Sequence, residues 1–213
     1  MFVDRKDAGM KLAAALEQYK DKGVLVLAIP RGGVEVGYEV ARHLNGDFSI
    51  IMARKLPFPL DPEAGFGAVA EDGSVFMFDE AHDWFSQATI ERTIAQQRQE
   101  ITRRIAALRG GKPLPEIAGR TVILVDDGIA MGATMRVAVQ LCRARGAEKV
   151  VVAAPVAGTE VAKDFESLAD ELVVLDRPPR FRAIAHAYRN WYDVPDWEVV
   201  AIMERWQKHS AER

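Results

Sequence analysis

The sequence contains a single cysteine, Cys142, among 213 residues. One cysteine excludes an internal disulfide and is typical of proteins that work in a reducing compartment. No apolar run approaches the roughly 20 residues of a membrane span, and the N-terminus lacks the charged and then apolar segments of a secretion signal. We therefore expect a cytoplasmic protein that has no membrane partner.

The chain also lacks a strong charge of either sign. It carries 28 Lys and Arg against 31 Asp and Glu, a formal net charge of −3, so no overall basic field attracts nucleic acid. The four histidines are scattered without metal-ligand spacing, and there is neither a Walker A motif nor a G-x-S-x-G nucleophile turn. We expect no nucleic-acid partner and none of the functions that these motifs mark.

Apolar runs that alternate with helical patterns fill most of the chain. Residues 24–29 and 122–125 are continuous apolar runs, as in parallel strands that are buried on both faces. A helical pattern over 34–44 separates the first run from another strand at 48–53, which makes a βαβ unit. We predict an α/β fold with a mostly parallel, doubly wound sheet in one domain, 1–213. The other expected elements are helices at 6–19 and 159–168, a helix ending at 145, and strands at 149–154 and 171–175.

An insertion over 54–112 departs from this alternation. Three prolines, at positions 57, 59 and 62, exclude regular structure at its start. A small hairpin with strands at 66–70 and 74–78 is predicted next, and a long amphipathic helix over 83–108 follows.

The C-terminal region, 177–213, is rich in aromatic residues and holds three of the four tryptophans. We predict that it forms a small helical cap. Its aromatic side chains either stack on a planar base or form the core of the cap itself.

Two aspartates follow the second apolar run. Asp126 and Asp127 stand at the carboxyl end of the predicted strand, the edge at which open α/β sheets bind ligands. The loop after them is small enough for its amides to surround an anion, and the next helix adds its positive dipole end. The loop residues are Gly128, Ile129, Ala130, Met131, Gly132, Ala133 and Thr134. We predict a sugar-phosphate site; the alternative is an ordinary strand-to-helix turn with two solvated acids.

A second loop repeats this pattern after the first strand. In Pro30-Arg31-Gly32-Gly33 the glycines allow the backbone to approach an anion, and the guanidinium adds a positive fork. Arg54-Lys55 follow the strand at 48–53, so three neighbouring strand ends carry Arg, Arg-Lys and Asp-Asp. Such cations could neutralise a bound anion; the alternatives are a tight turn that starts a helix and a solvated strand end.

Residues 122–135 resemble the fingerprint of the type I phosphoribosyltransferases, an apolar strand, paired acids and a small-residue loop ending Gly-x-Thr. The resemblance implies that Asp126 and Asp127 hold the ribose 2′- and 3′-hydroxyls of phosphoribosyl pyrophosphate, while the loop amides and Thr134 hold its 5′-phosphate. It also implies that the 30–33 loop binds the pyrophosphate, often through a non-proline cis peptide, and that 54–112 contains the flexible loop of this fold.

The loop departs from the family at Ala130 and Met131, where a Thr or Ser is often found. Phosphate binding would therefore depend more on backbone amides and Thr134. Family members that act on hypoxanthine or guanine place an Asp at the position of Ala130, facing N7 of the base, and members that act on adenine have Ala. The resemblance implies poor transfer to 6-oxopurines and leaves adenine, orotate and uracil open.

The combination of 30–33, Arg54-Lys55-Leu56, Pro62-Glu63 and Gly67-Ala68-Val69 is similar to a group of stand-alone predicted phosphoribosyltransferases without a settled acceptor. The implied reaction is Mg²⁺-dependent transfer of a phosphoribosyl group from phosphoribosyl pyrophosphate to a nitrogenous base or similar small acceptor, with release of pyrophosphate. The catalytic candidates are Asp126, Asp127, Arg31 and Lys55. The residues implied in substrate binding are Pro30, Arg31, Gly32, Gly33, Arg54, Lys55, Asp126, Asp127 and the 128–134 loop.

Mg²⁺ is the implied cofactor, and substrate oxygens would hold most of its coordination sphere. Asp126 and Asp127, acting through water, are the protein groups that could contribute. Glu63, Glu71 and Asp72 lie in the insertion and could act when the loop closes, and the sequence selects none of them. A homodimer is left open.

Two other functions use the same site. The first is a non-catalytic regulator that senses phosphoribosyl pyrophosphate, which a DNA-binding module would support, although the sequence shows none. The second is hydrolysis of an activated sugar phosphate. Release of pyrophosphate without an acceptor would distinguish this hydrolysis from transfer.

Overall fold

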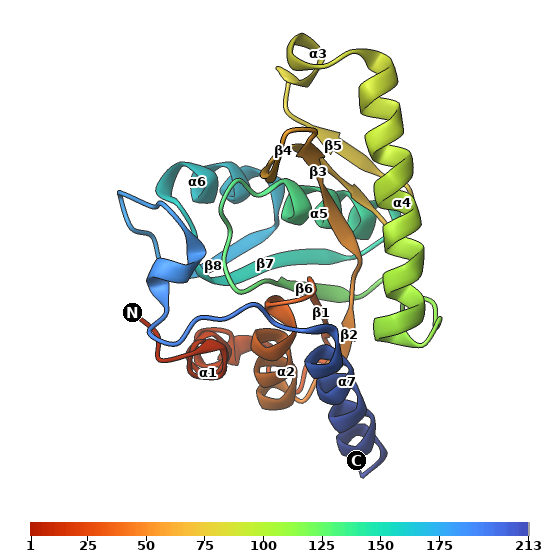
Figure 1. Cartoon of the computed structure of the whole chain (residues 1–213). Coiled ribbons are helices and arrows are strands. Elements are labelled where there is room, and N and C mark those ends of the chain that lie inside the picture. The colour runs from red at the N-terminus through yellow and green to blue at the C-terminus, as the bar shows by residue number, and fades with distance from the viewer. Residues whose placement is uncertain (213) are drawn as a thin grey trace.

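The structure of the chain, a computed structural model, describes residues 1–212, and only the backbone of Pro62 and Glu63. The expectation that Glu63 acts in the site therefore lies outside the described side chains. A central sheet has five parallel strands in the order β2-β1-β6-β7-β8 (Figure 1). Its strands are β1 (Leu25–Ala28), β2 (Asp47–Ile50), β6 (Thr121–Val125), β7 (Lys149–Val156) and β8 (Glu171–Asp176).

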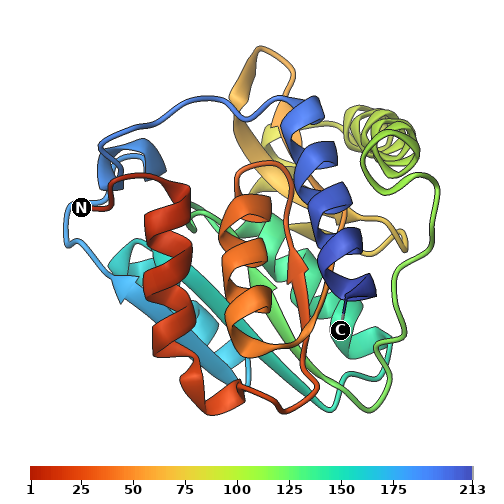
Figure 2. The same ribbon diagram turned by 90° about the horizontal axis from the view of Figure 1, so that it is seen from below.

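Helices cover both faces of this sheet, which confirms the doubly wound α/β prediction. Figure 2 shows one face, where three helices lie side by side: α1 (Arg5–Ala15), α2 (Gly33–Leu44) and α7 (Asp196–Ala211). The other face carries α5 (Ala133–Ala144) and α6 (Thr159–Leu168). Asp4 begins the first helix as its N-cap, because its side chain accepts the Asp7 N–H at 2.8 Å.

A second sheet of three antiparallel strands lies beside the first, in the order β3-β4-β5. Its strands are β3 (Ala53–Phe58), β4 (Asp61–Ala70) and β5 (Val75–Met77). The predicted hairpin at 66–78 is confirmed, but the expectation that the prolines exclude regular structure is wrong. Pro57 sits where the register between β3 and β4 shifts, and a proline is tolerated at such an irregularity because the ladder is already interrupted there. The strand predicted at 48–53 is likewise divided between β2 and β3.

The long helix of the insertion begins later than its periodicity indicates. Residues 81–84 form a separate short helix, α3 (Ala81–Trp84), and the long helix is α4 (Gln87–Arg109). Ser86 separates them as the N-cap of α4, since its hydroxyl accepts the Thr89 N–H at 3.3 Å. The predicted apolar side is confirmed, because Ile90, Ile101 and Leu108 are buried.

The C-terminal region contributes to the core through α7, which packs against α2 and α4. Trp206 meets Tyr38 and Phe48 edge to face, with ring centroids 6.1 and 5.4 Å away. Of the two roles left open for the aromatic tail, Trp206 therefore has the core role, whereas Trp197 is 71% exposed. None of the helices in the described part, residues 1–212, is long and apolar enough to cross a membrane.

Candidate functional site

The candidate site lies at the carboxyl ends of β1 and β6, which are adjacent and in register, with Ala28 beside Val125. From β1 the chain crosses to β2 on one side, and from β6 it crosses to β7 on the other. The crevice between two such strands is the place where doubly wound sheets bind ligands. The two loops that the sequence singles out, 30–33 and 126–134, both start at this point.

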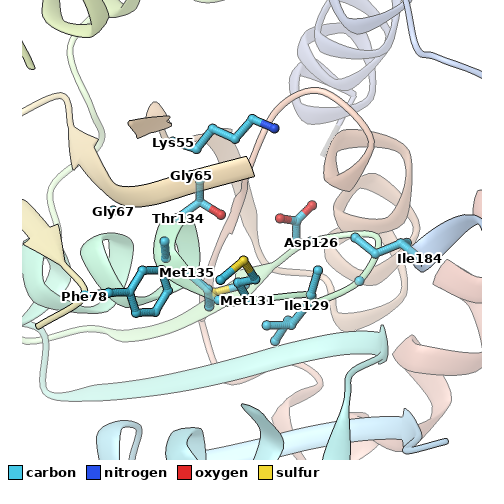
Figure 3. Close-up of a pocket in the computed structure, with 14 residues that line it drawn as sticks. Lys55, Gly65, Gly67, Phe78, Asp126, Ile129, Met131, Thr134, Met135 and Ile184 are labelled. Atoms are coloured by element: carbon cyan, nitrogen blue, oxygen red, sulfur yellow. The ribbon is translucent and has the colours of Figure 1, made fainter. Parts of the chain in front are cut away.

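A cavity of about 210 Å³ opens above the end of β6 (Figure 3). Figure 3 shows Lys55 reaching over it from β3 and Asp126 at the strand end. The predicted residues that line it are Lys55, Asp126, Gly128, Ile129, Ala130, Met131, Gly132, Ala133 and Thr134. The unpredicted lining residues are Gly65, Gly67, Phe78, Met135 and Ile184. The structure therefore brings the fingerprint loop, one acid and one cation together.

The 128–134 loop leads into the N-terminus of α5 through Gly132. Gly132 has φ +78° and is the N-cap of α5, and a Cβ at this position would lie 2.7 Å from the Phe165 ring. Only glycine meets both conditions without strain. The turn directs the chain into α5, whose first amides have no partner inside the helix, so this end of the cavity is suited to a phosphate.

The two aspartates have different surroundings. Asp126 is half-buried and lines the cavity, and one of its oxygens accepts the Asp127 N–H at 2.8 Å. Burial, together with the neighbouring Asp127, raises the pKa of Asp126 well above the usual carboxyl range. Asp126 is thus the acid that can meet a ligand in the cavity.

Asp127 turns away from the cavity. Its carboxylate accepts a hydrogen bond from Arg5 Nε at 2.8 Å, and the residue is only 7% exposed. Burial raises the pKa of Asp127, and the Arg5 charge opposes that shift. A Cβ on Gly32 would collide with the Asp127 carboxylate, so this acid lies directly against the 30–33 loop.

Two residues that hold this acid carry no signal in the sequence. Arg5 is 3% exposed, although it follows a helix cap where an arginine is ordinarily solvated. Tyr188 donates its hydroxyl to the Asp127 carbonyl at 2.6 Å, and burial raises the pKa of that phenol. Both contacts join the ends of the chain to its middle, so no local pattern could have revealed them.

The 30–33 loop contains the non-proline cis peptide that the family resemblance implies, between Pro30 and Arg31. It runs close to β6, since a Cβ on Gly33 would lie 2.9 Å from the Val125 carbonyl. The loop does not line the cavity. Arg31 Nη1 lies 3.5 Å from Asp196 Oδ1 at the start of α7, and its side chain is 37% exposed.

Arg54 and Lys55 lie on opposite faces of β3, as neighbours on a strand do. Lys55 lines the cavity, whereas Arg54 donates to Gln97 Oε1 of α4 at 3.2 Å. Burial and the nearby Arg104 lower the pKa of Arg54. The structure thus places Lys55 at the cavity and Arg54 at the interface with α4.

The other two candidate acids of the insertion, Glu71 and Asp72, lie away from the cavity. Glu71 forms a buried ion pair with Arg109 and accepts the Met52 N–H at 2.8 Å. Asp72 is exposed and binds Ser74 in the hairpin turn. Neither lines the cavity, so the structure gives both residues a role in holding the hairpin.

Among residues 1–61 and 64–212, whose side chains the structure describes, no cluster of three or more His, Cys, Asp or Glu side chains could hold a metal ion by itself. Of the side chains that the structure describes, Asp126 is the one that brings a carboxylate to the cavity. Such a site fits Mg²⁺, which binds through one or two carboxylates and takes its other ligands from water and substrate phosphates.

Comparison with known proteins places the chain in a family. The model of the phosphoribosyl transferase domain matches residues 4–178. Two Mycobacterium tuberculosis proteins, named "Putative phosphoribosyl transferase" Rv0571c and MT0597, are each 40% identical over 214 residues. These matches cover 100% of this chain and 48% of each relative, so the chain spans about half the length of the curated relatives it matches.

A solved structure resembles the whole chain. The crystal structure of TT1426 from Thermus thermophilus is 38% identical, has a TM-score of 0.81, and is matched over 96% of this chain and 98% of that chain. With the domain match over 4–178, the sheet order and the strand-end loops, the comparisons confirm the predicted resemblance: the chain belongs to the phosphoribosyl transferase domain family.

Proposed function

We propose that the chain transfers a phosphoribosyl group from phosphoribosyl pyrophosphate to a small nitrogenous acceptor and releases pyrophosphate. The observation that carries this proposal is the arrangement at the end of β6, where the cavity contains Asp126, Lys55 and the 128–134 loop. A carboxylate for hydroxyls, amides for a phosphate and a cation for a second anion are the groups that this sugar phosphate requires.

The cavity supports one orientation of the substrate. The 5′-phosphate would lie in the 128–134 loop with Thr134, which lines that end of the cavity. The ribose hydroxyls would meet Asp126, and the pyrophosphate would lie between Lys55 and the 30–33 loop. Asp127 would act from behind this loop, because its carboxylate is already bound to Arg5.

The reaction forms a bond from an acceptor nitrogen to C1 of the ribose and breaks the bond from C1 to the pyrophosphate oxygen. The bonding electron pair leaves with pyrophosphate, and the acceptor nitrogen gives up its proton. Negative charge therefore builds on the pyrophosphate, where Lys55 and Arg31 would stabilise it. Mg²⁺, held by substrate oxygens with Asp126 as the protein carboxylate, would supply further neutralisation when bound.

A second hollow supports a location for the acceptor. It has a volume of about 340 Å³ and shares Ala130 with the first cavity. Pro178, Pro179 and Phe181 line it beside the start of α6, and such faces suit a planar ring. An acceptor there would approach the sugar phosphate from the side of Ala130.

The test is a panel of nucleobases incubated with phosphoribosyl pyrophosphate and Mg²⁺. Pyrophosphate release and new nucleotide are measured together, and Asp126→Asn is the matched inactive control. We expect one base or related heterocycle to yield both products in equal amounts. Pyrophosphate release without an acceptor would instead show hydrolysis, and binding without turnover would show a sensor.

A further inference from the structure

We propose that Arg5 is a positioning residue that holds the Asp127 carboxylate against Gly32 and so fixes the 30–33 loop for pyrophosphate. This inference rests on the proposed function, because it assigns the residues that prepare one half of that site. It also gives the two acids different roles: Asp126 faces the cavity, and Asp127 supports the 30–33 loop.

Arg5 is held on several sides. Its Nε donates to Asp127 Oδ2 at 2.8 Å, and its Nη1 donates to the Tyr192 carbonyl at 3.0 Å. The guanidinium carbon lies 4.0 Å from the centre of the Trp191 ring, a distance at which a cation is attracted to an aromatic face. A buried arginine with this many partners has little freedom, so the position of its carboxylate partner is set as well.

Asp127 transmits this position to the loop. Its carboxylate occupies the place that any side chain at position 32 would need, which makes the contact with the loop backbone direct. The Tyr188 hydroxyl fixes the other end of the residue through the Asp127 carbonyl at 2.6 Å. The acid is therefore fixed at both ends and lies against Gly32 together with Arg5 Nε, which a Cβ on Gly32 would approach to 3.0 Å.

The aromatic partners of Arg5 belong to a segment that also borders the cavity. The N-terminal residues pair with this segment, since the Phe2 N–H donates to the Ala187 carbonyl at 2.7 Å and the Asn190 N–H donates to the Val3 carbonyl at 2.9 Å. Ile184, a few residues earlier, lines the cavity. Arg5 thus connects the 184–192 segment with the loop on the other side of the acid pair.

The test measures two ligands separately by calorimetry in the full chain. Pyrophosphate with Mg²⁺ reports on the 30–33 loop, and ribose 5-phosphate reports on the 128–134 loop. Arg5→Met should weaken pyrophosphate about tenfold, as expected when a hydrogen bond to a charged group is lost, and ribose 5-phosphate less than threefold. Arg5→Lys, which keeps the charge, should recover part of the loss.

The matched control is Arg120→Met, which removes an arginine that binds Asp47 and the Gly23 carbonyl at the opposite end of the sheet. It should leave both ligands unchanged. Arg5→Met leaves Asp127 buried without its cation, so the double variant Arg5→Met/Asp127→Asn gives the same information if the single variant does not fold. Its pyrophosphate affinity should equal that of Asp127→Asn, because Arg5 acts through this acid.

A lower melting temperature with unchanged pyrophosphate binding would show that Arg5 has only a structural role, and equal losses for the two ligands would also overturn the proposal. A wild-type chain that binds neither ligand would contradict the proposed function and this inference together. If the wild-type chain and Arg5→Met bind both ligands with the same affinities, the inference about Arg5 is contradicted and the proposed function is not.

Discussion

The Glu71 carboxylate and the Arg109 guanidinium form a buried ion pair that joins the β4–β5 turn to the last residue of α4. Their side chains are 8% and 5% exposed, and Arg109 Nη1 lies 2.9 Å from Glu71 Oε1. The same nitrogen donates to the Ile50 carbonyl at the end of β2 at 2.9 Å. One arginine therefore fastens the antiparallel sheet to the parallel one, next to the strand that carries Lys55.

We predict that Arg109→Met lowers the free energy of unfolding by about 3–5 kcal/mol, because it leaves the Glu71 carboxylate buried and unpaired. Urea unfolding measures the change. The control is Lys163→Met, which breaks a pair with Glu160 whose side chains are 61% and 85% exposed; it should cost at most about 1 kcal/mol. A similar, small loss in both variants would contradict this role of the ion pair.

Asp126→Asn should separate stability from binding. Because burial raises the pKa of Asp126 in the folded state, the folded chain binds a proton more tightly than the unfolded chain. The protonated carboxyl therefore contributes to the free energy of unfolding below its ordinary pKa, near 3.8. This contribution is lost as the pH rises through the raised pKa of the folded state. The asparagine variant should be more stable than wild type at neutral pH, and its affinity for phosphoribosyl pyrophosphate should fall more than tenfold.

Urea unfolding at several pH values and calorimetry of the ligand check this prediction. Asp7→Asn is the control of opposite sign. Hydrogen bonds from Lys11 and the Val3 N–H lower the pKa of Asp7. The ionised Asp7 therefore contributes to the free energy of unfolding above the ordinary carboxyl pKa, and this contribution is lost as the pH falls. An Asp126→Asn variant that is less stable than wild type at neutral pH, or that binds the ligand normally, would show that Asp126 is not the ligand-facing acid of the pair.

Arg31→Ala should weaken inhibition by pyrophosphate about tenfold, because pyrophosphate would lose a charged hydrogen-bond donor. The effect on ribose 5-phosphate should be smaller. Inhibition and binding assays measure the two ligands. Arg103→Ala is a suitable control, since Arg103 reaches the same Asp196 from α4 at 3.9 Å but is 56% exposed. Equal losses for the two ligands in Arg31→Ala would place Arg31 away from the pyrophosphate end.

Gly132→Ala should weaken ribose 5-phosphate more than tenfold. The alanine would have to adopt φ +78° and would bring its Cβ within 2.7 Å of the Phe165 ring, so the 128–134 loop must move. Gly110→Ala is the matched control, because Gly110 also has positive φ (+61°) but a Cβ there meets nothing within 4 Å. Both variants should lose about 1–2 kcal/mol of stability from the left-handed backbone. Comparable binding in the two would contradict the assignment of the phosphate to this loop.

The parts of the fold that the sequence predicts are those with local causes. Residues 24–29 and 122–125 become β1 and β6 because continuous apolar runs are stable only between two covering layers. The 128–134 loop is predictable from its small residues, and Gly132 indeed requires a glycine. By contrast, β3 could not be predicted, because a proline within a sequence ordinarily indicates that it is not a strand. Only the pairing with β4 shows that the register is already interrupted at Pro57.

The division between Asp126 and Asp127 could not be predicted, since both are acids at the same strand end. Their difference depends on Arg5, which is more than a hundred residues away in the chain, and on Gly32, which has no side chain to occupy the space of the carboxylate. The orientation of Arg54 and Lys55 could be predicted in part. Alternation along a strand predicts that their side chains lie on opposite faces, but only the position of α4 shows which of the two reaches the cavity.

We predict that Ala130 influences the choice of acceptor, because it borders both the cavity at the end of β6 and the neighbouring hollow. A methyl group can neither donate a hydrogen bond to N7 of a purine nor take its proton, so the arrangement that the resemblance associates with 6-oxopurines is missing. We expect hypoxanthine and guanine to be poor acceptors and adenine to be a better one, while orotate and uracil stay open because this position does not contact a pyrimidine ring.

Initial rates with adenine and hypoxanthine at matched concentrations measure the preference. Ala130→Asp supplies the control, since it should raise the rate with hypoxanthine relative to adenine. Faster transfer to hypoxanthine by the wild-type chain would show that another residue provides the acid and that Ala130 does not select the acceptor.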